Sequence, residues 1–235
     1  MSEIYFIRHA QASFEKDNYD QLSALGIWQA QILGDYFTSL GVKFDSVYAG
    51  TMKRQIDTAE GVLARVPKDR SRLKAHRRSA FDEYDFAGIL KSQIPLMIDA
   101  EPALAETLSR IQSDRRAFQA LFEGAVKRWV SGRYDIGGIE TWLDYGARIR
   151  RGVQQLMEEN GSKKRAAVFT SGGCVAVAMQ MALDISDAKT IELSWQVRNT
   201  SVSVFKYGSG GLGLSSFNSV AHLKAQDDAE LLTYR

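Results

Sequence analysis

Short apolar runs alternate with longer stretches of helical spacing along most of this chain. Residues 4–7, 46–49 and 166–169 consist of β-branched, aromatic and small apolar side chains, which are typical of buried strands. Residues 22–40 and 52–66 repeat apolar side chains at helical spacing, and another apolar helix is expected to end near Leu183. The alternation predicts an α/β fold with a largely parallel central sheet and helices on both faces.

The other segments complete this prediction. Residues 202–205 and 212–215 flank a glycine-rich turn and predict a terminal hairpin. Residues from about 89 to 160 are expected to be mostly helical, and the basic stretch 68–78 is interpreted as a solvated loop. A length of 235 residues indicates one domain, or one domain with a large insertion.

Composition excludes some classes of partner. The 30 basic residues nearly balance the 28 acidic ones, which argues against a nucleic-acid binder. No stretch approaches the ~18 consecutive apolar residues of a membrane span, so no membrane partner is expected. Cys174 is the single cysteine. A single cysteine cannot form an intrachain disulfide, and the N-terminal segment does not resemble a secretory signal. Both features favour a cytoplasmic protein.

Groups suited to binding an anion follow the three apolar runs that predict buried strands. Arg8 and His9 follow the first strand, and Arg54 follows the second. Ser171 and Gly172 follow the third, at the predicted start of a helix. Because open sheets of this kind bind ligands at the carboxyl ends of their strands, these groups are expected to lie together. Guanidinium groups and the free N–H groups of a helix start attract anions, and an imidazole is a nucleophile.

Each of these residues also fits an ordinary structural role when it is considered alone. The Arg8–His9 pair fits a capped loop, and Glu83, a carboxylate at the edge of the pattern, fits a surface acid. His76 is expected to be exposed, and His222 to pack or hydrogen-bond. No cluster of His, Cys and carboxylates has metal-ligand spacing, so neither a metal nor another cofactor is predicted.

The chain resembles the histidine phosphatase (phosphoglycerate mutase-like) superfamily through short motifs that occur in the order the family has them. These motifs are Arg8-His9-Ala10-Gln11, Leu22-Ser23-Ala24-Leu25-Gly26, Tyr48-Ala49-Gly50-Thr51-Met52-Lys53-Arg54, Thr58-Ala59-Glu60 and Asn199-Thr200-Ser201-Val202-Ser203. Together they extend over nearly the whole chain.

The resemblance implies a single domain over residues 1–235 with a helical cap insertion at about 85–140 that sets specificity. It implies a phosphohistidine mechanism, in which His9 is the nucleophile and Glu83 the acid and base. Arg8, Arg54, Ser171 and Gly172 would bind the phosphoryl group. The expected partner is a small phosphorylated substrate or inorganic phosphate. The sequence does not decide the oligomeric state and leaves a homodimer open.

The chain departs from the family pattern at Ala10 and Gln11, which replace the usual glycine and glutamate, and at two further positions. Ser171 stands where the family has its second catalytic histidine, and a neutral donor there binds a phosphoryl group more weakly than a charged one. Glu15 stands where mutase-type members often carry asparagine. These departures favour a slow phosphomonoester hydrolase over a mutase. The alternative is a non-catalytic protein of the same fold that binds a phosphorylated ligand or a partner.

Overall fold

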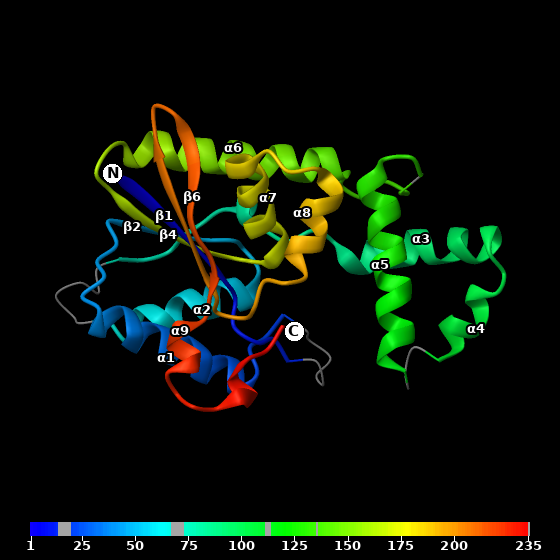
Figure 1. Cartoon of the computed structure of the whole chain (residues 1–235), viewed down its shortest axis with the longest axis horizontal. Coiled ribbons are helices and arrows are strands. Elements are labelled where there is room, and N and C mark those ends of the chain that lie inside the picture. The colour runs from blue at the N-terminus through cyan, green and yellow to red at the C-terminus, as the bar shows by residue number, and fades with distance from the viewer. Residues whose placement is uncertain (14–19, 67–72, 111–113, 135, 235) are drawn as a thin grey trace. The chain divides into compact units, whose positions relative to one another are not determined.

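A six-stranded sheet forms the centre of the protein in this computed structural model, which describes residues 1–13, 20–66, 73–110, 114–134 and 136–234 (Figure 1). Its strand order is β3-β2-β4-β1-β5-β6. Neighbours among β1 to β4 are parallel, and β5 and β6 continue the sheet antiparallel. The mostly parallel α/β fold is therefore confirmed. The strands are Ser2–Arg8 (β1), Ser46–Ala49 (β2), His76–Arg77 (β3), Arg165–Thr170 (β4), Val202–Gly208 (β5) and Gly211–Ser219 (β6).

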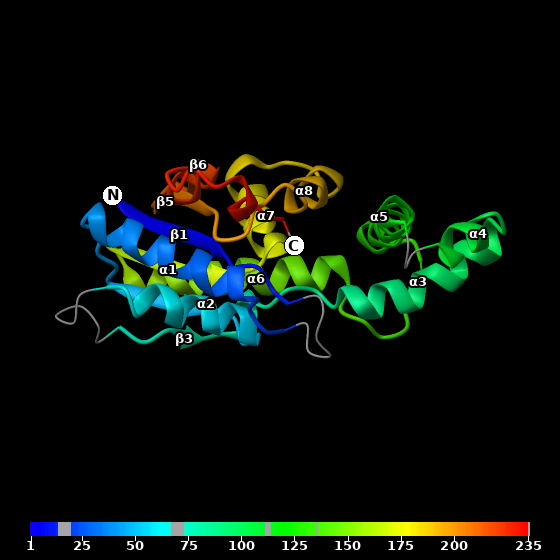
Figure 2. The same ribbon diagram turned by 90° about the horizontal axis from the view of Figure 1, so that it is seen from below.

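Helices cover both faces of this sheet. Figures 1 and 2 show α1 (Ala24–Ser39) and α2 (Lys53–Leu63) side by side on one face. The part of α6 (Trp142–Asn160) from Ile149 onwards lies on the other face, and α7 (Gly172–Leu183) contacts β1 and β6. Two short helices, α8 (Asp187–Ser194) and α9 (Ala221–Lys224), follow later in the chain.

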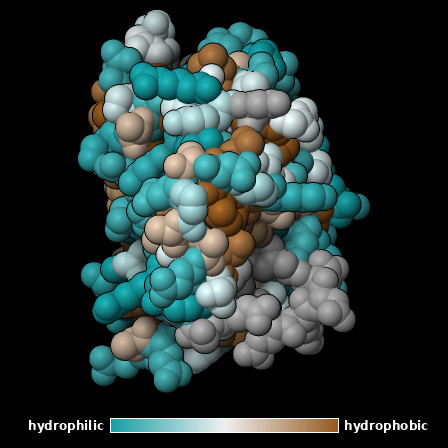
Figure 3. All heavy atoms as spheres, turned by 90° about the vertical axis from the view of Figure 1, so that its right-hand side faces the viewer, coloured by the Kyte–Doolittle hydropathy of each residue, from teal (hydrophilic) through white to brown (hydrophobic). Residues whose placement is uncertain are grey.

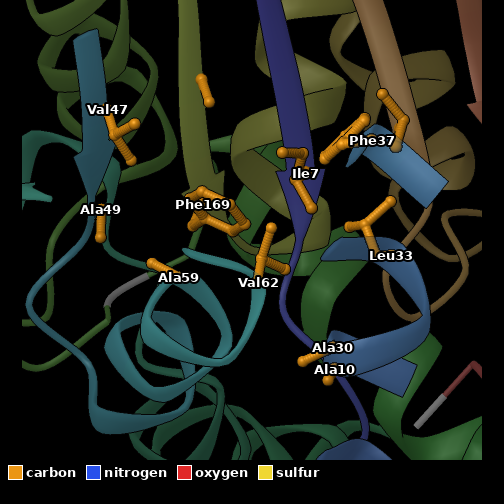
Figure 4. Packing of buried hydrophobic residues seen from close by; sticks show 12 residues of the cluster. Ile7, Ala10, Ala30, Leu33, Phe37, Val47, Ala49, Ala59, Val62 and Phe169 are labelled. Carbon is orange, nitrogen blue, oxygen red and sulfur yellow. The ribbon is translucent and has the colours of Figure 1, made fainter. Parts of the chain in front are cut away.

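The core under α1 and α2 joins three strands to two helices. Ile7, Val47 and Phe169 point from β1, β2 and β4 toward Leu33 of α1 and Val62 of α2 (Figure 4). All five are at most 1% exposed. Each buried side chain of this size contributes about 1.5–3 kcal/mol to stability. Ile4, Phe6, Ala166 and Val168 are buried as well, so β1 and β4 are apolar on both faces, which explains why they appear in the sequence as unbroken apolar runs.

A glycine allows the start of α1 to meet the loop that follows β1. A Cβ atom on Gly26 would lie 2.1 Å from the backbone oxygen of Gln11. Ser23 caps the same helix by accepting a hydrogen bond from the Gly26 N–H, and its hydroxyl donates to Gln11 Oε1 at 2.7 Å. The helix and the loop after His9 therefore form one tightly packed unit.

The sequence-based prediction was wrong at one strand and missed two helices. Residues 68–72 of the basic stretch lie outside the described residues, but His76 and Arg77 form β3, which pairs with β2 at the edge of the sheet. Both side chains are exposed, so a strand of this length carries no apolar pattern. The helices α8 and α9 are too short for a recognisable period.

The described chain divides into two compact units, Met1–Glu83 with Ile149–Arg235 and Tyr84–Arg148. The second unit contains α3 (Phe86–Ala100), α4 (Leu104–Ser109) and α5 (Arg115–Ser131). Trp129 lies at the centre of an aromatic cluster with Tyr84, Trp142 and Tyr145, and its Nε1 donates to the Glu140 carbonyl at 2.8 Å. This unit contains the range for which a cap insertion is predicted; its role in specificity stays a prediction.

The surface of the side shown in Figure 3 is mostly hydrophilic. Apolar side chains reach it in a narrow area near the middle of the view. None of the helices in the described part of the chain has the length and apolar character needed to span a lipid bilayer.

The histidine near the C-terminus is a structural residue, as predicted. His222 is 1% exposed, its Nε2 lies 3.0 Å from Thr200 Oγ1, and its ring packs beside Tyr36. Burial lowers the pKa of His222 from 6.5 to about 4. His76, by contrast, is exposed, again as predicted.

We expect the free energy of unfolding to fall as the pH drops from about 7 to about 4. The folded-state pKa of His222 lies below its unfolded value, so the unfolded chain binds the proton more strongly in this window. At pH 5, His222 alone lowers the free energy of unfolding by about 2 kcal/mol relative to pH 7.5. Urea unfolding at pH 7.5 and pH 5 measures the loss. His222→Gln should reduce it, whereas the matched change His76→Gln should not; equal losses in both variants would contradict the assignment.

Candidate active site

Several predicted site residues lie in segments that begin at the ends of strands that are neighbours in the sheet. β4 lies between β1 and β2, and all three point the same way. His9, Gly50 and Ser171 each follow directly after the end of one of these strands. The sheet therefore brings together three segments that are far apart in the sequence.

Hydrogen bonds fix the backbone of His9 on both sides. Its N–H donates to the Thr170 carbonyl at 2.7 Å, and its carbonyl accepts from Asn199 Nδ2 at 3.0 Å. The next N–H, that of Ala10, donates to Thr58 Oγ1 at 3.0 Å. Thr58 in turn donates to the Arg54 carbonyl at 2.6 Å, which ties the turn after β1 to α2.

The imidazole of His9 is set in one tautomer. Its Nδ1 lies 2.8 Å from the Ala10 carbonyl oxygen. A carbonyl can only accept, so Nδ1 carries the proton and Nε2 keeps its lone pair. The Arg54 Nε–H donates to that lone pair at 3.3 Å. Burial, followed by the positive charges of Arg54 and Arg8, lowers the pKa of His9 well below its ordinary range. The ring is therefore neutral at physiological pH.

Arg54 lies between the imidazole and a carboxylate. It is 6% exposed, and its Nη1 donates to Asp20 Oδ1 at 2.7 Å. The other oxygen of Asp20 accepts the backbone N–H of Lys53 at 2.7 Å, at the start of α2. Arg8 is half-buried, and its Nη1 donates to the Val197 carbonyl. Asp20 was not among the predicted site residues, because nothing in its local sequence links it to Arg54.

The side chain of Glu83 contacts the start of α7. Its Oε2 accepts the backbone N–H of Gly173 at 3.0 Å. Gly172, the first residue of the helix, is packed closely, since a Cβ atom there would lie 2.8 Å from the Ser194 carbonyl oxygen. The N–H groups and dipole of a helix start stabilise negative charge. The structure thus connects the predicted acid to the segment that also carries Ser171.

Ser171 contacts a glutamine that the sequence analysis did not single out. Gln55 Nε2 donates to Ser171 Oγ at 2.9 Å and to the Phe81 carbonyl at 3.1 Å. Gln55 is 0% and Ser171 1% exposed. A Cβ atom on Gly50 would lie 1.8 Å from Gln55 Oε1, so glycine at position 50 makes room for the amide.

Comparison with known proteins identifies the family. The model of the histidine phosphatase superfamily (branch 1) matches residues 4–220. The chain belongs to the histidine phosphatase superfamily. No protein among curated sequences matches it.

Solved histidine phosphatase structures share its fold at low sequence identity. A phosphoserine phosphatase mutant from Entamoeba histolytica in complex with phosphoserine has a TM-score of 0.64 and 17% identity, and the match covers 95% of this chain and 100% of that one. A phosphoglycerate mutase from Bacillus anthracis has a TM-score of 0.65 and 16% identity, with 97% of each chain covered. A mycobacterial glucosyl-3-phosphoglycerate phosphatase with inorganic phosphate has a TM-score of 0.60 and 17% identity, with 94% and 98% covered.

Ser171, directly after β4, and Gln55, in the first turn of α2, are hydrogen-bonded to each other. That Ser171 replaces a second histidine of the family stays a prediction from the sequence. Glu15, the other departure, lies outside the described residues. The described residues contain no group of three or more His, Cys, Asp or Glu side chains that could hold a metal ion.

Proposed function

We propose that this histidine phosphatase is a phosphomonoester hydrolase that works through a phosphohistidine on His9. The observation that carries the proposal is the state of the His9 ring: its Nδ1–H donates to the Ala10 carbonyl and its Nε2 lone pair faces Arg54. A neutral imidazole with a fixed lone pair is a nucleophile, and an adjacent guanidinium attracts the phosphoryl group that it would attack. The structural relatives that contain phosphoserine and inorganic phosphate support a small phosphomonoester as substrate.

In the first step, the Arg54 N–H leaves His9 Nε2 and donates to a phosphoryl oxygen instead. The freed Nε2 lone pair forms a bond to phosphorus while the bond from phosphorus to the ester oxygen breaks. Glu83, in its protonated form, gives its proton to the departing oxygen, and an alcohol leaves. Arg8 and Arg54 spread the charge of the transferred group, which is most of what a protein contributes to phosphoryl transfer.

In the second step, water attacks the phosphohistidine. Glu83 takes a proton from the water, the phosphorus–nitrogen bond breaks, and inorganic phosphate leaves with His9 neutral again. Glu83 thus returns to its protonated form. The N–H of Gly173 stabilises the carboxylate form between the steps, since it donates to Oε2.

A second candidate function is a binding protein that keeps the pocket without turnover. The observation that favours it is Ser171, which offers one neutral donor where the resemblance expects an imidazole. Loss of one donor to a transition state costs about 10²–10³ in rate in well-studied sites, which slows an enzyme without silencing it.

Trapping phosphate on the protein separates the two functions. We expect a 32P-labelled aryl phosphate, quenched in alkali after milliseconds to seconds, to leave acid-labile label on wild-type protein, together with slow release of inorganic phosphate. A folded protein that binds phosphate but neither becomes labelled nor releases product would support the binding function.

Turnover is expected to be unchanged, within about 2-fold, after exhaustive treatment with EDTA. The anion-binding groups in the proposal are guanidinium and backbone N–H groups, which need no metal bridge to a phosphoryl group. Initial rates with and without EDTA, and after adding Mg²⁺, Mn²⁺ or Zn²⁺, measure this. Activity that disappears with EDTA and returns with one of these ions would refute it.

A further inference from the structure

We propose that Gln55 is a positioning residue that turns the Ser171 hydroxyl into a hydrogen-bond donor for the bound phosphoryl group. The inference rests on the proposed site and assigns a role to a residue beside it. Gln55 and Ser171 would then act as a pair at the position of the missing histidine.

The Phe81 carbonyl decides how the Gln55 amide is oriented. It lies 3.1 Å from the amide nitrogen, and a carbonyl cannot donate, so the NH₂ group must face it. The same NH₂ group lies 2.9 Å from Ser171 Oγ. One of its two hydrogens serves each contact. Ser171 is therefore the acceptor in its bond with Gln55.

Ser171 must then direct its own proton elsewhere. The Phe81 carbonyl does not take it, because that oxygen already accepts from Thr170 Oγ1 at 2.6 Å and from Gln55 Nε2 at 3.1 Å. The Ser171 side chain does not cap α7. In the part of the chain that the structure describes, its hydroxyl donates to no acceptor.

The residues next to Ser171 and Gln55 in the sequence both contact His9, which places the pair beside the proposed nucleophile. Ser171 follows Thr170, whose carbonyl accepts the His9 N–H, and Gln55 follows Arg54, whose Nε donates to His9 Nε2. A phosphoryl group on His9 would offer oxygen acceptors beside these residues. A hydroxyl that already accepts a hydrogen bond is polarised and donates more strongly.

The Gln55 amide is tightly packed against Gly50. Gln55 Oε1 is buried, and it lies where Gly50 leaves space that any side chain would fill. A carboxylate at position 55 could not donate to Ser171; it would accept the hydroxyl proton instead and turn the donor away from the phosphoryl group. Gln55→Glu and Gln55→Met therefore separate the donor pattern from the size of the side chain.

A double-mutant cycle on phosphate affinity tests the pair. Isothermal titration with inorganic phosphate and with orthovanadate is performed on wild type, Gln55→Met, Ser171→Ala and the double variant. We expect Gln55→Met to weaken binding about 3- to 10-fold in the wild-type background and less than 2-fold once Ser171 is alanine. Gln55→Glu should weaken phosphate binding more than Gln55→Met does. This additional loss should disappear when Ser171 is alanine, because no hydroxyl is then left for the carboxylate to turn away.

Gln93→Met, the same change at another fully buried glutamine, is the matched control and should leave affinity unchanged. Thermal melts verify folding, and if Gln55→Met does not fold, the isosteric Gln55→Glu completes the cycle. Equal losses with and without Ser171, or no phosphate binding by wild type, would overturn the proposal. The cycle measures binding and needs no turnover, so it is independent of the proposed hydrolase function. If Gln55 and Ser171 are coupled but the protein never forms phosphohistidine, only the hydrolase function is refuted.

Discussion

His9→Asn is expected to lower the turnover of an aryl phosphate at least 10³-fold and to leave the protein folded. Asparagine has no lone pair able to form the covalent intermediate, so only binding and charge stabilisation remain, and loss of a nucleophile in well-studied enzymes costs far more than this. The backbone contacts of His9 to Thr170 and Asn199 do not depend on its ring and should persist.

Initial rates and alkaline-quench labelling measure the effect. His222→Asn is the control, since it removes another buried imidazole from the same unit, and it should retain turnover at pH 7.5. Equal turnover in the His9→Asn and wild-type proteins, after separate purification to exclude contamination, would disprove the nucleophile assignment.

Glu83→Gln is expected to lower turnover of an alkyl phosphate about 10²- to 10⁴-fold, the usual contribution of a general acid or base. An alkoxide leaves poorly without a proton, whereas a nitrophenolate leaves readily. The rate of the first step should therefore fall much less with nitrophenyl phosphate than with an alkyl phosphate. The second step still lacks its base. With the nitrophenyl ester, the variant should therefore accumulate labelled phosphohistidine above the wild-type level.

Glutamine keeps an oxygen that can accept the Gly173 N–H, which limits any structural effect. Glu159→Gln is the control, because Glu159 is a carboxylate paired with Arg78 at the surface. Equal rate losses for both esters without accumulated label would assign Glu83 a structural role at the start of α7.

Much of the first unit could be predicted from the sequence because its signals are local. The runs that became β1, β2 and β4 are apolar on both faces, and α1 begins at a serine cap and packs through a glycine. The position of Arg8 at a strand end, and of His9, Arg54 and Ser171 after strands, follows from the same alternation. The edge strand β3 could not be found, because two exposed basic residues carry no strand pattern.

The finer arrangement of the site depends on contacts between distant residues. Asp20 pairs with Arg54 across 34 positions, and Gln55 reaches Ser171 across 116. Neither residue has a local signal that separates it from ordinary polar positions on a turn or a helix. The tautomer of His9 likewise depends on the path of the backbone at Ala10, which residue types alone do not specify.

The strand order has a consequence for the time at which the protein can fold. β1 leaves the ribosome before the other described strands of the sheet, but its neighbours in the sheet are β4 and β5, which begin at Arg165 and Val202. Until those residues are synthesised, β1 and β2 expose unpaired edges and apolar faces, which favour aggregation. Pairings of such long sequence separation also make folding slow. Chains truncated before Arg165 should therefore be insoluble, and refolding of the full chain should depend on temperature and protein concentration.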